Sequence, residues 1–184
     1  MYPFPRRHGR AGALAAGTAL LAALAACGGG SSHTTKNVLG IAVPMATAIS
    51  DVAAARRDYM DESGGRYVHV IADGGMGRSG EIVKAVACGA DAVMLGAALA
   101  RAGNAPGHGY HWGPEAHHPQ VPRGERVHVG TAGSLEEILL GPARTPDGTT
   151  NIVGALRRAM ATTGYSDLKE FQRVEVVVSP YRPS

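Results

Sequence analysis

Residues 67–95 constrain the fold more than any other part of this chain. Residues 68–72 form a short apolar, β-branched run and residues 92–95 form a second one, which predicts two buried strands. Between them, apolar side chains recur at helical spacing, at Ile82, Val83, Val86 and Ala87. Gly89 is suited to end that helix, because glycine readily adopts the conformation that closes helices. The stretch therefore predicts two parallel strands joined by a helix.

Each predicted strand runs directly into glycine. Asp73, Gly74 and Gly75 follow the first strand, and Gly96 follows the second. Strands that end this way leave bare backbone N–H groups at the carboxyl edge of a parallel sheet. Because phosphorylated ligands bind at that edge in α/β folds, the two glycine ends predict a phosphate site.

Composition narrows the class of protein. The chain has 184 residues with 45% hydrophobic content, enough for one domain core. Its formal net charge is only +3 and aromatic residues make up 5%, so a nucleic-acid partner is not expected. The two cysteines, Cys27 and Cys88, lack the paired spacing of a zinc site and indicate no disulfide framework.

Residues 1–27 differ from the rest of the chain. Arginines near the start precede an uncharged, alanine-rich run that closes at Cys27 and is followed by GGGSS. This pattern predicts a secretory leader of the bacterial lipoprotein kind, with Cys27 as the lipidated residue and the only link to a membrane. The alternative is a buried alanine-rich helix with an incidental cysteine.

The remaining segments predict short elements. Residues 45–60 show the pattern of an amphipathic helix with Arg56 among its polar residues. Residues 103–124 are rich in glycine, proline and histidine and follow no period. Ser134 and Ser166 are the expected N-caps of two later helices. The later elements are a strand at 126–129, helices at 134–140, 151–163 and 166–171, and a strand at 174–178.

Three segments carry a family resemblance: GGGSSHTTKNVLGIAVP, VIADGGMGRSGEIVKAVACGADAVMLG and IVGALRRAMATTGYSDLKEFQRVEVVV. In order and spacing they resemble the carboxyl-terminal part of the IMP dehydrogenase/GMP reductase family, nearest to its IMP dehydrogenase-related bacterial branch. The resemblance runs from about residue 28 to residue 178. It implies an α/β fold, a (β/α)8 barrel that binds a purine nucleoside monophosphate at the carboxyl ends of its strands. It also implies a cytoplasmic homo-oligomer that uses NAD, with potassium as a further ligand that the family allows.

The resemblance gives roles to the glycine-rich strand ends. Asp73 matches the aspartate that binds the ribose hydroxyls, and one carboxylate can accept from both. The alternative is that Asp73 caps the turn that follows it. Gly74, Gly75 and Gly96 match the substrate-binding turns, where only glycine lets backbone amides come close to a phosphate. Ala97 stands where the family often has a serine hydroxyl.

The loop before the amphipathic helix departs from the family pattern. The family loop reads Gly-Ser-x-Cys-Thr-Thr, whereas this chain has Gly-Ser-Ser-His-Thr-Thr, which puts His33 at the position of the cysteine that attacks C2 of IMP. An imidazole replaces a thiolate poorly in that step. Ser31 matches a serine that touches the phosphate, although a flexible tether would explain it equally well. Cys88 is expected to be a buried structural thiol.

Residues 103–124 occupy the place of the family's mobile flap. No arginine–tyrosine pair for activating water is present in it, and a surface flap with incidental histidines is expected in preference to a metal site. The relevant side chains are Tyr110, His111, Trp112, Glu115, His117, His118 and Arg123.

A full barrel takes about 250 residues and eight strands, and this chain supplies two or three. The expected organisation is a leader at 1–27, a partial barrel at 28–178 and a tail at 179–184. Three functions are compatible with it: an IMP dehydrogenase-type oxidoreductase that converts IMP to XMP with NAD, a degenerate purine-nucleotide-binding module, and an exported lipoprotein with a binding role.

The leader hypothesis predicts that Cys27 is needed for membrane attachment. In a bacterium that processes lipoproteins, the expressed chain should partition into the detergent phase, and Cys27→Ala should move it to the aqueous phase. Equal partitioning of the two chains into the aqueous phase would contradict a used leader.

Overall fold

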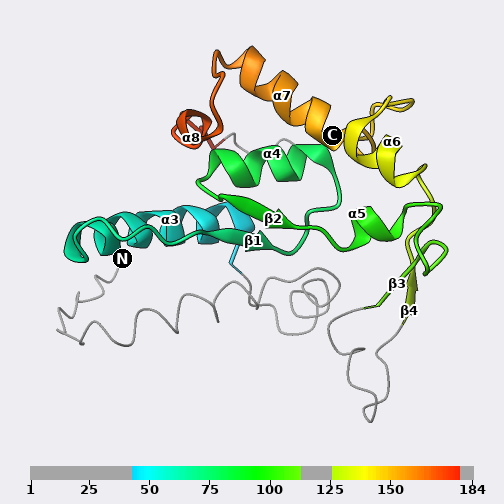
Figure 1. Ribbon diagram of the computed structural model, residues 1–184, viewed down its shortest axis with the longest axis horizontal. Helices are drawn as coiled ribbons and strands as arrows, with labels where there is room; N and C mark the ends of the chain where they lie inside the picture. The colour runs from blue at the N-terminus through cyan, green and yellow to red at the C-terminus, as the bar shows by residue number, and fades with distance from the viewer. Residues whose placement is uncertain (1–42, 113–125, 179–184) are drawn as a thin grey trace, which may run out of the picture.

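The structure is a computed structural model that describes residues 43–112 and 126–178 (Figure 1). The segments 1–27, 28–42 and 113–125 and the tail after 178, with the predictions made for them, lie outside the described residues. The helices and strands are, in chain order, α3 (Met45–Glu62), β1 (Ile71–Asp73), α4 (Ser79–Ala87), β2 (Ala92–Met94), α5 (Ala97–Ala100), β3 (Tyr110–Trp112), β4 (Arg126–His128), α6 (Leu135–Leu140), α7 (Ile152–Thr162) and α8 (Leu168–Phe171).

The centre of the fold is the predicted strand–helix–strand unit. Strands β1 and β2 pair in parallel, with Ala72 opposite Val93 and Asp73 opposite Met94, and α4 connects them. Both strands are three residues long, shorter than the apolar runs from which they were predicted. The parallel pair with its crossover helix confirms the α/β class.

Both ends of α4 are closed by local hydrogen bonds. At its start, Glu81 Oε2 accepts from the backbone N–H groups of Gly77 and Arg78, each at 2.9 Å. At its end, Gly89 N–H donates to Val86 O and Ala90 N–H donates to Ala85 O, with φ +110° at Gly89. This is the Schellman arrangement, so Gly89 ends the helix as predicted.

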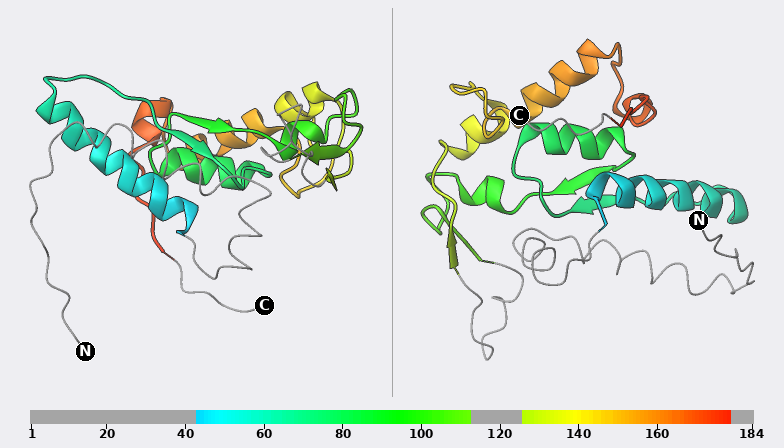
Figure 2. Two further views of the ribbon diagram at one scale, coloured as in Figure 1. Left: turned by 90° about the horizontal axis from the view of Figure 1, so that it is seen from below. Right: turned by 180° about the vertical axis from the view of Figure 1, so that it is seen from behind.

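Helices cover one face of the parallel pair. Figures 1 and 2 show α4 along the strands and α7 on the side of α4 away from them. Ala72 of β1 is fully buried on this face, and Ile49 of α3 and Ile82 of α4 are buried in the same core cluster. Ile138 and Ile152 extend the cluster to α6 and α7. Burial of these side chains is what holds the helices on the sheet.

The opposite face of the pair is uncovered by the residues that the structure describes. The register places Ile71 and Ala92 on it, together with Asp73 and Met94. Ile71 is 46% exposed and Met94 is 53% exposed. The prediction that both strands are buried was therefore wrong for this face, because a two-stranded sheet with helices on one side leaves its other side open.

The segment after α5 contains β3, which no periodicity predicted, in an antiparallel pair with β4. His111 of β3 lies opposite Val127 of β4, which confirms the short strand predicted at 126–129. Backbone hydrogen bonds also join the residues just before β3 to those just after β4. Gly103 N–H donates to Gly133 O at 2.8 Å, and Val129 N–H donates to Gly109 O at 2.8 Å.

The carboxyl-terminal helices follow the predicted order, with one wrong cap and one wrong strand. Ser134 accepts from Glu137 N–H and caps α6, as predicted. Helix α8 is capped by Asp167, which accepts from Lys169 and Glu170 N–H, and not by Ser166. Residues 174–178 form no strand, and Val178 is 91% exposed. An apolar run forms a strand only where a neighbouring edge can pair with it.

Among the described residues, no helix is both long and apolar enough to cross a membrane.

Gly89→Ala should destabilise the fold. A β-carbon at residue 89 would lie 2.7 Å from the β-carbon of Ala53 in α3, and φ at this position is left-handed. We expect the free energy of unfolding in urea to fall by about 2 kcal/mol. Gly80→Ala is the matched control, because residue 80 is in α4 with open space around it; it should be neutral or stabilising. Equal effects of both changes would contradict this account.

Candidate functional site

The carboxyl end of β1 leads into a turn that only glycine fits well. Gly74 and Gly75 have φ angles of +110° and +73°, in the left-handed region that L side chains avoid. A β-carbon on Gly75 would meet nothing within 4 Å, so the backbone at this point faces open space. The turn therefore presents exposed backbone where a ligand group can approach closely.

The second glycine end lies level with the first. Gly75 is two residues beyond Asp73 and Gly96 is two residues beyond Met94, and Asp73 and Met94 are opposite each other in the register. Both glycine ends therefore lie at the same edge of the sheet, as predicted. The ring of His111 lies against Gly96: its Cε1 and Nε2 atoms are 3.1 and 3.2 Å from the position that a β-carbon on Gly96 would take.

Asp73 ends β1 with a half-buried side chain. Among the described residues its carboxylate has no hydrogen bond or ion pair. The backbone amides of Gly77 and Arg78, at the end of the turn that follows, donate to Glu81 instead. Those two amides at the start of α4 are therefore satisfied by Glu81, and the Asp73 carboxylate is not committed to them.

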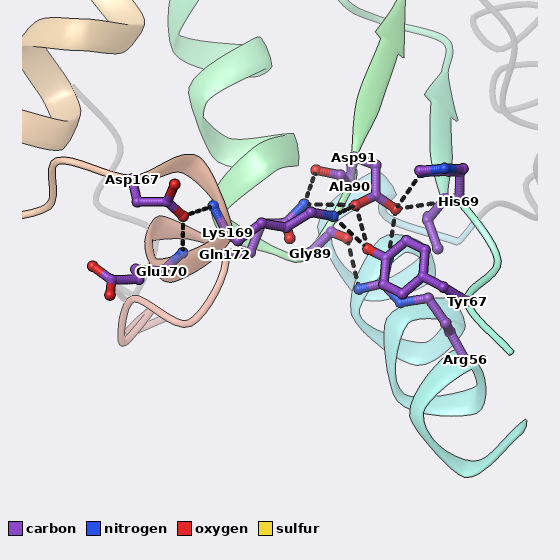
Figure 3. A network of polar contacts seen from close by, with 11 residues as sticks. Arg56, Tyr67, His69, Gly89, Ala90, Asp91, Asp167, Lys169, Glu170 and Gln172 are labelled. Atoms are coloured by element: carbon purple, nitrogen blue, oxygen red, sulfur yellow. Dashed lines mark hydrogen bonds and ion pairs between the residues drawn. The ribbon is translucent and has the colours of Figure 1, made fainter. Parts of the chain in front are cut away.

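The amino edge of the same sheet holds a different carboxylate, and Figure 3 shows its surroundings. Asp91, just before β2, has a side chain only 7% exposed. Arg56 Nη1 of α3 lies 2.5 Å from Asp91 Oδ2, and the hydroxyl of Tyr67 donates to Oδ1 at 2.5 Å. Lys169 of α8 forms an ion pair with Oδ1, and Gln172 Nε2 donates to it at 3.2 Å. The backbone N–H of residue 70 also donates to Oδ2, at 2.8 Å.

These contacts determine whether Asp91 and Lys169 are charged. Burial raises the pKa of Asp91, but the hydrogen bonds from Lys169, Tyr67, the residue 70 amide and Gln172 outweigh burial and hold the pKa far below its usual range. Burial lowers the pKa of Lys169, and its bonds to Asp91 and Tyr67 outweigh that effect, so the pKa is raised. Both groups are therefore charged at neutral pH, and the network joins α3, β2 and α8.

Comparison with known proteins assigns the family. The family model described as "IMP dehydrogenase / GMP reductase domain" matches residues 16–124, more than half of the chain. This chain belongs to the IMP dehydrogenase/GMP reductase family. It is an oxidoreductase family, and the resemblance seen in the sequence is confirmed.

Individual relatives of this family cover most of the chain. An uncharacterized oxidoreductase of Mycobacterium leprae is 58% identical over 148 residues, which is 79% of this chain and 40% of that protein. An inosine-5'-monophosphate dehydrogenase of Aquifex aeolicus is 34% identical, over 85% of this chain and 35% of that protein. This chain thus spans about two fifths of the length of the mycobacterial relatives that it matches.

A solved structure supports the same family fold. The crystal structure of an IMP dehydrogenase/GMP reductase-like protein from Corynebacterium glutamicum superposes with a TM-score of 0.71 at 57% identity. The match covers 79% of this chain and 39% of that one.

Of the residues that the family resemblance selected, the structure brings together those at the strand ends. Asp73, Gly74, Gly75 and Gly96 lie at one edge. Ser31, His33 and Cys27, like His117 and His118, lie outside the described residues, and their roles stay predictions. Cys88 is half-buried, caps the end of α4 and packs against the core, in keeping with a structural thiol. No cluster of three potential metal ligands occurs in residues 43–112 and 126–178.

At two residues the structure shows contacts that the sequence did not reveal. Arg56 was placed among the polar residues of its helix, yet it is 7% exposed and reaches Asp91. His111 was expected to be an incidental flap histidine, and in the structure its half-buried ring lies beside Gly96. Only the spacing of an arginine and an aspartate 35 residues apart could have suggested the first contact, and that signal is too weak to use alone.

Asp91→Asn should destabilise the chain by about 3 kcal/mol at pH 7, because it leaves Arg56 buried without its counter-charge. The folded pKa of Asp91 is lowered, so the stabilisation is complete above the unfolded pKa of about 4 and is lost as the pH falls from there. Urea unfolding at several pH values measures this. Asp51→Asn, an exposed position on α3, is the control; a pH-independent gap between wild type and Asp91→Asn would contradict the account.

Proposed function

We propose that the chain supplies the purine-nucleotide site of an IMP dehydrogenase-type oxidoreductase. One observation carries the proposal: the Asp73 carboxylate, uncommitted within the described residues, lies at the same sheet edge as the glycine ends at 75 and 96. Family membership points to the same ligand class.

The chemistry of a nucleoside monophosphate suits this edge. An ionised carboxylate accepts hydrogen bonds only, and the two ribose hydroxyls are adjacent donors that one carboxylate can take together. Gly75 and Gly96 are both exposed, and neither carries a β-carbon that would keep phosphate oxygens away from the backbone N–H groups. In this proposal the sugar lies at Asp73 and the phosphate lies beyond it.

The reaction proposed is oxidation of IMP at C2 to XMP, a step of purine nucleotide synthesis, with NAD as hydride acceptor and water as the source of the new oxygen. NAD and potassium enter from the family alone, and we assign no described residue to either. The Aquifex aeolicus relative is an inosine-5'-monophosphate dehydrogenase by name, which favours this reaction over reduction of GMP.

A second candidate is nucleotide binding without turnover. His33 stands where the family loop has its cysteine nucleophile, and imidazole adds poorly to C2. The chain would then bind the nucleotide but would not oxidise it. The two candidates share Asp73 and differ in whether NADH forms.

The finer architecture is also a proposal. We propose that β1, α4, β2 and α5 are consecutive parts of a (β/α)8 barrel, with the open face that carries Ile71 and Met94 directed to the barrel interior. A cytoplasmic homo-oligomer follows from the family. The family match starts at residue 16, inside the proposed leader at 1–27, so Cys27→Ala partitioning decides between export and a cytoplasmic location.

Asp73→Asn should weaken IMP binding at least tenfold, because it replaces a charged acceptor of the ribose hydroxyls. Titration calorimetry of the full chain with IMP measures this. With 2'-deoxy-IMP the loss caused by Asp73→Asn should be smaller, since one of its hydroxyl partners is absent. Asp58→Asn, on the exposed face of α3, is the control. Unchanged IMP affinity in Asp73→Asn would contradict the ribose role.

Formation of NADH from IMP and NAD separates the two candidate functions. Turnover that disappears in Asp73→Ala supports the oxidoreductase. Binding of IMP without NADH supports the binding module, and in that case His33→Cys tests whether the loop position limits the chemistry. Absence of IMP binding in the folded wild-type chain would overturn both.

A further inference from the structure

His111 lies on the glycine end of β2. Its ring atoms Cε1 and Nε2 come within 3.1 and 3.2 Å of where a β-carbon on residue 96 would lie, so the imidazole fills the space of the missing side chain. A larger residue at 96 would press on the ring. The absence of a side chain at Gly96 thus has two effects: the backbone at the sheet edge is exposed, and there is room for the His111 ring from β3.

The position of this imidazole is fixed by the β3–β4 pair. His111 lies opposite Val127 and between two further registered pairs, Tyr110 with His128 and Trp112 with Arg126. Its side chain is half-buried, and among the described residues its ring nitrogens have no hydrogen-bond partner. The strand pairing fixes the backbone of His111, and its ring has an N–H that is free to donate a hydrogen bond to a ligand oxygen.

The sequence lacks one polar group at this place. Residue 97, which follows the glycine end, is alanine, where the family often has a serine whose hydroxyl serves the phosphate. The side chain of alanine offers no donor. The imidazole of His111 lies beside Gly96, the residue that precedes Ala97 in the chain.

We propose that His111 donates an N–H to the phosphate of the bound purine nucleoside monophosphate and replaces the hydroxyl that Ala97 lacks. The inference rests on the proposed function, because it assigns a further residue to the same site. It makes His111 a specificity residue for the phosphorylated form of the ligand. The ring recognises the phosphate through a charge-assisted hydrogen bond, the kind in which an ionised acceptor roughly doubles the strength.

The test compares IMP with inosine, which has the same base and ribose but no phosphate. In His111→Ala, the dissociation constant for IMP should rise about tenfold or more, whereas that for inosine should stay within about twofold. His111→Gln keeps an N–H donor and should recover most of the IMP affinity. Calorimetry of the full chain, with competition where inosine binds weakly, gives both constants.

His128→Ala is the matched control. His128 lies on the same strand pair, on the opposite face from His111, and its ring packs on Tyr110 with 4.8 Å between centroids. If the two histidines served only the packing of the β3–β4 pair, His128→Ala and His111→Ala would both weaken the binding of IMP and of inosine to the same extent.

The possible outcomes are distinct. A loss confined to IMP, with recovery in His111→Gln, supports the phosphate role. Unchanged IMP affinity in His111→Ala, or equal losses for IMP and inosine, overturns it and leaves the proposed function standing. A folded wild-type chain that binds neither ligand overturns the proposed function and this inference with it.

Discussion

The buried carboxylate of Asp91 is the interaction on which the rest of the structure depends. It receives Arg56 from α3, Tyr67 and the residue 70 amide from the segment before β1, and Lys169 from α8. These groups come from three separate parts of the chain and meet at the start of β2. Since the strands are only three residues long, backbone pairing alone would hold them weakly. The charged network anchors the residue just before β2 to α3, to α8 and to the segment before β1.

The two edges of the small sheet divide structural and functional chemistry between them. At the amino edge an aspartate is surrounded by donors and cations and has no capacity left for a ligand. At the carboxyl edge Asp73 is uncommitted among the described residues, beside glycines that keep the backbone accessible. The same residue type thus serves as an anchor at one end and as a candidate acceptor at the other, and its surroundings alone make the difference.

Local signals predicted the parts of the fold that local forces determine. The helix of residues 79–87, its stop at Gly89 and the Ser134 cap depend on spacing and on hydrogen bonds within a few residues. The family motifs also placed Asp73 and Gly96 at one edge. What the sequence did not show depends on distant partners: the burial of Arg56 requires Asp91, and the place of the His111 ring requires β3, which no period reveals. Residues 174–178 read as a strand because their composition is apolar, and composition does not show whether an edge is available.

Within the part of the chain that the structure describes, alanine makes up five of the ten residues of the core cluster, at positions 72, 85, 90, 98 and 102. Side chains this small let the helices lie close to the strands, which suits a sheet only two strands wide. Such a core has little to lose by truncation and little room for enlargement. Sequence drift at these sites is therefore bounded by volume more than by polarity: serine or glycine fits the space, and valine or leucine does not. Relatives that differ here should show paired exchanges, in which one position grows as its neighbour shrinks.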